Sequence, residues 1–81
     1  MKLNVLFFAQ ARERVGASSA PLELPPDSRV RDALAAIERA YPQLEPLRAH
    51  LAVAVDGVLA RADDVLAEGA ELALLPPVSG G

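Results

Sequence analysis

The final residues LLPPVSGG, positions 74 to 81, combine two strand-stopping prolines with two bare glycines. Proline has no backbone N–H and a fixed φ, so Pro76 and Pro77 are expected to end strand pairing. Residues 76–81 are then expected to project as a flexible tail with Ser79 near its tip. Because Gly80 and Gly81 have no side chains, that tip can enter a narrow channel in another protein.

The reactive group at such a tip is the α-carboxylate of Gly81, which is ionised at neutral pH and is a poor electrophile. A partner that converts it to an acyl adenylate with ATP makes it reactive toward a sulfur donor, giving a thiocarboxylate, or toward an amine, giving an amide. Ser79 is not expected to be a nucleophile, because no arrangement of histidine and carboxylate accompanies it. The pattern therefore predicts that Gly81 carries an acyl-transfer reaction.

Composition excludes several other chemistries. The chain has no cysteine and a single histidine, His50, which rules out disulfides, cysteine nucleophiles and Cys/His zinc sites. The adjacent carboxylates of Asp63 and Asp64 are interpreted as a solvated turn, since two such groups without further ligands are a poor metal site. No metal site and no bound cofactor are predicted, and ATP is expected to be used only by the activating enzyme.

Charge and hydropathy narrow the range of partners. The formal net charge is −3, and the arginines, including Arg12 and Arg14 in an expected solvated loop, are scattered along the chain. With only 4% aromatic residues as well, nucleic-acid binding is not expected. No apolar run is long enough to span a bilayer and no signal peptide is recognisable, so we expect a cytoplasmic protein without a membrane partner.

Hydropathy patterns predict the elements that hold the tail. Residues 2–9 favour a strand, 10–20 a connection and 21–25 a second strand that forms a hairpin with the first. A helix is expected from an N-cap at Asp27 or Ser28 to Pro42, with Val30, Leu34, Ile37 and Tyr41 on its apolar stripe. A loop then leads to a strand over 49–55, an Asp56-Gly57 hairpin turn, a short strand over 58–61 and a last strand over 71–75.

This order predicts one α+β domain over residues 1–81, in which a mixed sheet packs on one main helix. That arrangement is the β-grasp, or ubiquitin-like, architecture. Phe8, Leu59 and Leu75 are then left on the face of the sheet that the helix does not cover. We expect these three residues, with Pro76 and Pro77, to bind a partner. The side chains expected to face the helix are Leu3, Val5, Phe7, Leu22, Leu24, Leu51, Val53, Val55, Leu72 and Leu74.

Three stretches carry a resemblance to a known family: VLFFAQARERVG at 5–16, AVDG at 54–57 and EGAELALLPPVSGG at 68–81. Together they resemble the small subunit of molybdopterin synthase over essentially the whole chain. The tail shows no departure from the family pattern, although Leu74 and Leu75 stand where aromatic residues are often found.

The resemblance implies a sulfur carrier without a catalytic site of its own. An activating enzyme of the ubiquitin-E1-like kind would adenylate Gly81, and a sulfur donor would convert it to a thiocarboxylate. The tail would enter the large catalytic subunit, in a heterotetramer, and donate sulfur to cyclic pyranopterin monophosphate during molybdenum cofactor biosynthesis. The resemblance assigns Phe8, Leu59 and Leu75 to the surface that faces this partner.

Three alternatives share the fold. A sulfur carrier for thiamin or for tRNA thiolation would differ only in its acceptor. A ubiquitin-like modifier would join Gly81 to lysines of target proteins. A plain β-grasp interaction module would not need its tail.

Overall fold

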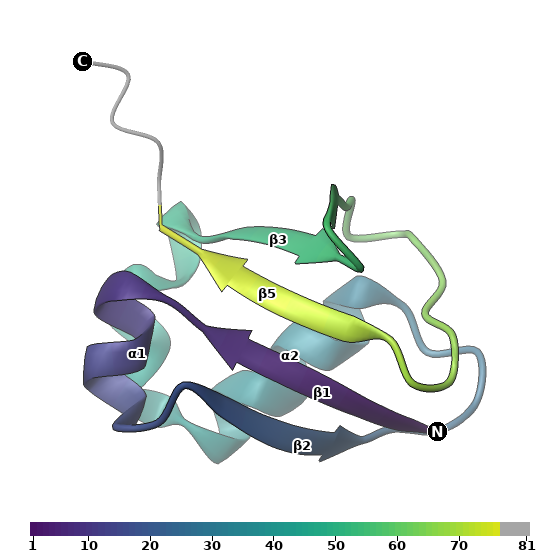
Figure 1. The fold of residues 1–81 in the computed structure, drawn as a ribbon, viewed down its shortest axis with the longest axis horizontal. Helices are drawn as coiled ribbons and strands as arrows, with labels where there is room; N and C mark the ends of the chain where they lie inside the picture. The colour runs from purple at the N-terminus through teal and green to yellow at the C-terminus, as the bar shows by residue number, and fades with distance from the viewer. Residues whose placement is uncertain (77–81) are drawn as a thin grey trace.

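A mixed five-stranded sheet in the order β2-β1-β5-β3-β4 organises the computed structural model, which describes residues 1–76. The central strands β1 and β5 are parallel, and the other neighbours are antiparallel. Helix α2 crosses behind the sheet and covers one face (Figure 1). The predicted α+β class, with a mixed sheet on one main helix, is confirmed. The strands are β1 (Lys2–Phe7), β2 (Ser19–Glu23), β3 (Ala52–Val55), β4 (Val58–Leu59) and β5 (Glu71–Leu75).

The core lies between this sheet and α2 (Val30–Ala40), which buries Val30, Ala33 and Ile37. Of the predicted stripe, Leu34 and Tyr41 are only partly buried. Phe7 is 1% exposed and meets Tyr41 edge to face, with ring centroids 5.4 Å apart. Of the predicted core residues, Leu3, Val5, Phe7, Leu24, Val53, Leu72 and Leu74 are buried, whereas Leu22, Leu51 and Val55 are partly buried against them.

The predicted connection over 10–20 is wrong in part, because a short helix, α1 (Ala9–Val15), forms there. It starts abruptly: Ala9 has a φ of 49°, and no side chain caps the first turn. It ends at Gly16, whose φ of 82° is suited to glycine and whose N–H donates to the Arg12 carbonyl. Only Ala11 is buried, so the pattern along the sequence is too weak to reveal the helix. The antiparallel strands β1 and β2 are therefore joined through a helix rather than by a tight turn.

The expected N-cap of α2 at Asp27 or Ser28 is also wrong, since the cap is Arg29. The Ser28 hydroxyl donates instead to the Pro25 carbonyl at 2.8 Å, and Asp27 has a φ of 66°. The Arg29 N–H donates to the Asp32 carboxylate at 2.8 Å. Neither Asp27 nor Ser28 therefore caps α2, and the Asp32 carboxylate binds the N-cap backbone at Arg29 instead.

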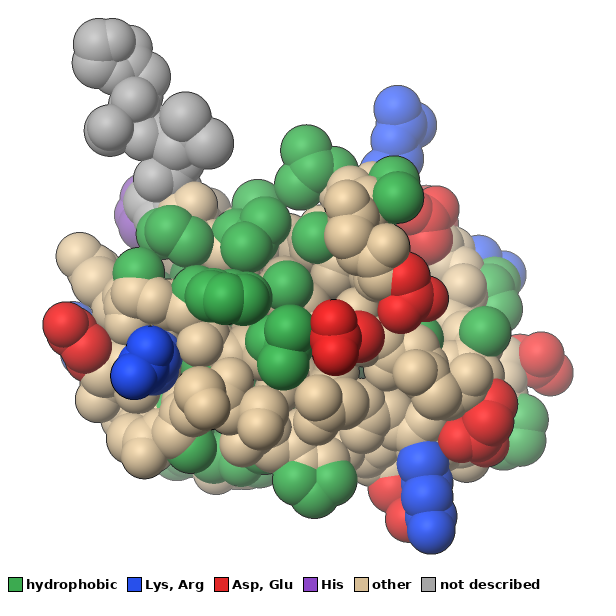
Figure 2. Space-filling model, in the orientation of Figure 1, with side chains coloured by type: hydrophobic (Ala, Val, Ile, Leu, Met, Phe, Trp, Pro, Cys, Tyr) green, Lys and Arg blue, Asp and Glu red, His purple; other side chains and the backbone are tan. Residues whose placement is uncertain are grey.

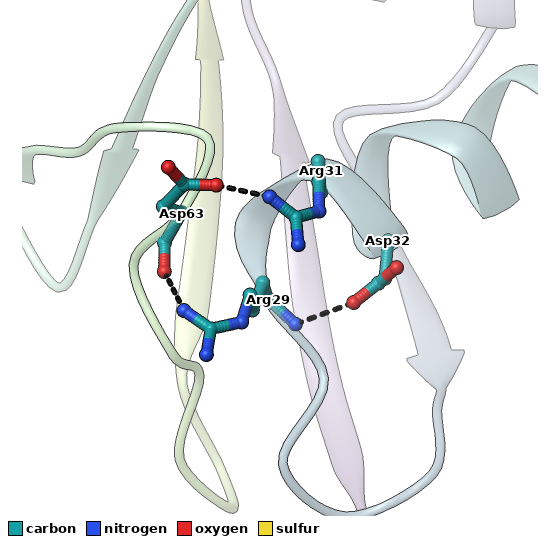
Figure 3. A network of polar contacts seen from close by, with 4 residues as sticks. All are labelled: Arg29, Arg31, Asp32 and Asp63. Atoms are coloured by element: carbon teal, nitrogen blue, oxygen red, sulfur yellow. Dashed lines mark hydrogen bonds and ion pairs between the residues drawn. The ribbon is translucent and has the colours of Figure 1, made fainter.

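The segment between β4 and β5 closes the N-terminus of α2. The N–H of Val30 donates to the Asp64 carbonyl at 2.9 Å, and the N–H of Arg31 donates to the Ala62 carbonyl at 3.0 Å. The Arg29 guanidinium donates to the Asp63 carbonyl at 2.6 Å, and Arg31 forms an ion pair with the Asp63 carboxylate (Figure 3). The first backbone N–H groups of α2 have no partner within the helix. They therefore hold the segment between β4 and β5, although this segment contains no long helix or strand.

Other boundaries shift by a few residues. The predicted loop after α2 is a 3-10 helix, η1 (Pro42–His50), which buries Leu44. The helix takes in the first residues of the strand predicted over 49–55. The second strand lies at 19–23 rather than 21–25, and the fourth spans two residues. The last strand, 71–75, agrees with the prediction. Within the described residues, no helix has the length and apolar character needed to cross a membrane.

Candidate functional site

The face of the sheet opposite α2 is apolar at one end. Side chains alternate along a strand, and Leu72 and Leu74 of β5 point into the core, so Ala73 and Leu75 point to the open face. Leu6 of β1 is on this face for the same reason, and the extended backbone of Phe8, with φ −122° and ψ 154°, continues the alternation. The end of β5, after which the chain continues to Pro76, therefore borders this apolar surface.

Strand register brings the apolar residues of four strands into rows. Leu6 is paired with Ala73, Ala73 with Ala54, and Ala54 with Leu59. The next row pairs Ala52 with Leu75. Side chains that are directly opposite on neighbouring strands lie about 4.5–5.5 Å apart, so each row is continuous. The resulting open-face patch consists of Leu6, Phe8, Ala52, Ala54, Leu59, Ala73 and Leu75.

Exposure of this patch is uneven. Leu59 is 72% exposed and Phe8 is 43% exposed, whereas Ala54 between the strands is buried. The exposed side chains of Phe8 and Leu59 thus lie on either side of the small residues Ala54 and Ala73. Figure 2 shows hydrophobic side chains gathered over β3 and the end of β5. A surface of this kind suits an apolar partner element.

Acidic and polar groups border the other end of the open face. Asn4 is paired with Glu71, and the Glu71 N–H donates to the Asp56 carboxylate at 3.0 Å. In Figure 2, Asp and Glu side chains flank the apolar cluster on the side away from the end of β5. The face therefore changes from apolar to acidic along β5.

The predicted partner-binding residues are brought together only in part. Phe8, Leu59 and Leu75 share the open face, and Pro76 follows Leu75 as an exposed residue. The predictions for Pro77, Ser79, Gly80 and Gly81 lie outside the described residues. The apolar character of this face was predictable from the sequence, but four of its residues were not predicted to belong to the site: Leu6, Ala52, Ala54 and Ala73. Strand register was the missing signal, and one sequence does not show which strands are neighbours.

The remaining candidate residues either have structural roles or are exposed to solvent. Asp63 pairs with Arg31, and the Asp64 carboxylate accepts from the Arg61 N–H at 2.8 Å, so both belong to the turn. His50 is exposed in the last turn of η1. Among residues 1–76, no cluster of three or more His, Cys, Asp or Glu side chains has a metal-binding arrangement. Arg12 and Arg14 are exposed on α1 rather than in a loop.

Comparison with known proteins assigns the chain to a family. The model of the ThiS family matches residues 5–81. The chain belongs to the ThiS family. It is 35% identical over 83 residues to the molybdopterin synthase sulfur carrier subunit of Chlamydomonas reinhardtii, with 100% of both chains covered. It is 37% identical over 81 residues to the subunit of the same name from Haemophilus influenzae, covering 98% of this chain and 99% of the relative.

A solved structure supports the same family and fold. The crystal structure of small archaeal modifier protein 1 from Haloferax volcanii matches with a TM-score of 0.87 and 33% identity, covering 95% of this chain and 98% of that one. The resemblance drawn from the sequence stretches is therefore confirmed at the level of the family, and the β-grasp architecture is confirmed with it.

Proposed function

We propose that this ThiS-family protein is a sulfur carrier subunit of molybdopterin synthase. The observation that carries the proposal is the apolar open-face patch at the end of β5, from which residues 76–81 continue. A carrier of this kind must hold a partner beside its tail while the tail delivers its cargo. Similarity over the whole chain to two sulfur carrier subunits supports the same assignment.

The proposed chemistry takes place at Gly81. Its carboxylate attacks the α-phosphorus of ATP on an E1-like activating enzyme, and pyrophosphate leaves. Sulfide-level sulfur then attacks the carbonyl carbon and the C–O bond to AMP breaks, which leaves a thiocarboxylate; where the donor is a persulfide, a thiol reductant cleaves the S–S bond of the acyl disulfide that forms first. This sulfur is donated to cyclic pyranopterin monophosphate. The sequence has no cysteine, so the terminal carboxylate is the group of this chain that would carry the sulfur.

The proposed partner is the large catalytic subunit, in a heterotetramer. The open-face patch would provide the apolar contact, with Phe8 and Leu59 at its two sides. Leu75, Pro76 and Pro77 would connect this contact to the tip, Ser79, Gly80 and Gly81. The acidic border around Glu71 would favour a partner with basic side chains at the matching end. This chain itself would supply position and cargo, with catalysis left to the partner.

Mass spectrometry of the protein purified from its own cells tests the proposal. The expected result is a fraction of chains with one oxygen replaced by sulfur, mapped to the peptide that ends at Gly81. Deletion of Gly81, or addition of one residue after it, should leave the unfolding curve unchanged and abolish sulfur transfer in a reconstituted synthase. Full activity of either variant would rule out the mechanism.

Protein modification is the second candidate. It is favoured by the similarity to small archaeal modifier protein 1, which extends over 95% of this chain. Conjugates of high mass that depend on Gly81 would support it. A carrier for thiamin or tRNA thiolation would be recognised by sulfur transfer to those acceptors in the same reconstitution.

A further inference from the structure

We propose that Lys2 is a modification site whose ε-amine accepts the activated Gly81 carboxylate of a second copy of this chain. Lys2 is the lone lysine, because the other seven of the eight basic residues are arginines. Arginine is not a nucleophile at neutral pH, since its guanidinium stays protonated. The inference rests on the proposed function in one respect: Gly81 must be activated as an acyl adenylate.

Lys2 is available for this reaction. It is exposed at the start of β1 and is on the open face, two residues before Asn4. Within residues 1–76, the ion pairs are Arg31 with Asp63 and Arg48 with Glu38, so no carboxylate of that part forms an ion pair with the Lys2 ammonium. The Lys2 backbone is fixed, because its N–H donates to Glu68 at 2.8 Å and its carbonyl accepts from Gly69 at 2.8 Å. Within the described residues, the Lys2 side chain is therefore free of ion pairs, whereas its backbone is held by two hydrogen bonds.

The competing amine is engaged in the fold. The α-amino group of Met1 donates to the Leu24 carbonyl at 2.8 Å and continues the ladder between β1 and β2. Its attack on an acyl group would require the loss of this hydrogen bond and fraying of the end of the sheet. Attack by the Lys2 ε-amine does not require the loss of this hydrogen bond, so Lys2 is the favoured acceptor.

The surroundings of Lys2 suit amide formation with a glycine. A hollow of about 360 Å³ beside it is lined by Lys2, Pro21, Leu22 and Glu23. Two glycines without side chains fit a hollow of that size. Glu23 is paired with Lys2 across β1 and β2, so rotation of the two side chains can bring its carboxylate to the amine, where it accepts the proton that is released. In the step itself, the neutral amine attacks the carbonyl carbon, a C–N bond forms, and the C–O bond to AMP breaks.

Strand direction makes a second copy the donor. β1 and β5 are parallel, so Lys2 and the exit after Leu75 are at opposite ends of the sheet (Figure 1). Six strand residues, about 20 Å, separate these ends. The six residues 76–81 span about 20 Å only when fully extended, which leaves no length for reversing direction at Pro76. The tail of a second copy is not subject to this length limit. The product is therefore a dimer in which Gly81 of one copy is joined to Lys2 of the other.

The test uses the full chain with an E1-like activating enzyme and ATP, without a sulfur donor. Hydroxylamine in a parallel reaction captures activated Gly81 as a hydroxamate and so reports activation alone. The expected product is a covalent dimer whose mass is two chains less one water. Trypsin should release from it a branched peptide in which residues 1–12, uncut at Lys2, are joined to residues 62–81.

The matched variant is Lys2→Arg, which keeps the positive charge and removes every lysine. It should form the hydroxamate and accept sulfur like the wild type, while its dimer falls to background. A hydroxamate without any wild-type dimer, or a dimer that persists in Lys2→Arg, would overturn the inference and leave the proposed function standing. A monomer that has lost water at Lys2 would overturn the second-copy arrangement. Failure to form the hydroxamate would overturn both proposals.

Discussion

The adjacent residues Phe7 and Phe8 have opposite environments, and the substitution Phe8→Asp exploits the difference. Phe7 is 1% exposed in the core, whereas Phe8 is 43% exposed on the open-face patch. If that patch is the docking surface for the large subunit of molybdopterin synthase, Phe8→Asp should weaken the complex while the free protein stays folded.

The expected loss follows from the exposed area. A phenylalanine side chain has roughly 200 Å² of apolar surface, so the part of Phe8 that remains exposed is about 85 Å². Covering that area with a partner stabilises a complex by about 2 kcal/mol, at about 25 cal/mol per Å². Loss of this contribution raises Kd about thirty-fold. An exposed substitution of this kind changes the free energy of unfolding by less than about 1 kcal/mol.

Isothermal titration with the large subunit measures Kd, and urea unfolding of the same samples measures stability. Ala35→Asp is the control, because Ala35 is exposed on α2, which covers the opposite face of the sheet (Figure 1). It should leave Kd unchanged. Equal affinity of the Phe8→Asp variant and the wild type, or equal weakening by both substitutions, would refute the assignment of this face.

Three further substitutions test how the fold holds this surface. Leu72→Ala removes a side chain with 0% exposure and should lower the free energy of unfolding by about 2–5 kcal/mol in urea; a loss under 1 kcal/mol would contradict this packing. Gly57→Ala adds a Cβ that meets no atom within 4 Å, so a loss of about 1 kcal/mol from the φ of 85° alone is expected in thermal unfolding. Ala9→Gly relieves a φ of 49° at the start of α1 and should raise stability by about 0.5 kcal/mol, and a decrease would show that the helix tolerates this backbone without strain.

Features that depend on neighbouring residues were predictable from the sequence alone. The alternation of Leu72 and Leu74 with Ala73 and Leu75 identified β5 at its observed bounds. Pro42 marked the end of α2, because the residue before a proline avoids helical geometry. Asp56-Gly57 marked the hairpin, since both residues accept the positive φ that its turn requires. Each of these signals acts within a few residues.

Features that depend on distant partners appeared only in the tertiary structure. Helix α1 has one buried residue, Ala11, and its short length gives no periodicity to recognise. The N-terminus of α2 is closed by carbonyls of Asp64 and Ala62, about thirty residues away, so no local cap predicted Arg29. The open-face patch likewise exists because strand register places Ala54 between Ala73 and Leu59. Alternation assigns a residue to a face of its own strand, but only pairing between strands decides which side chains on that face become neighbours.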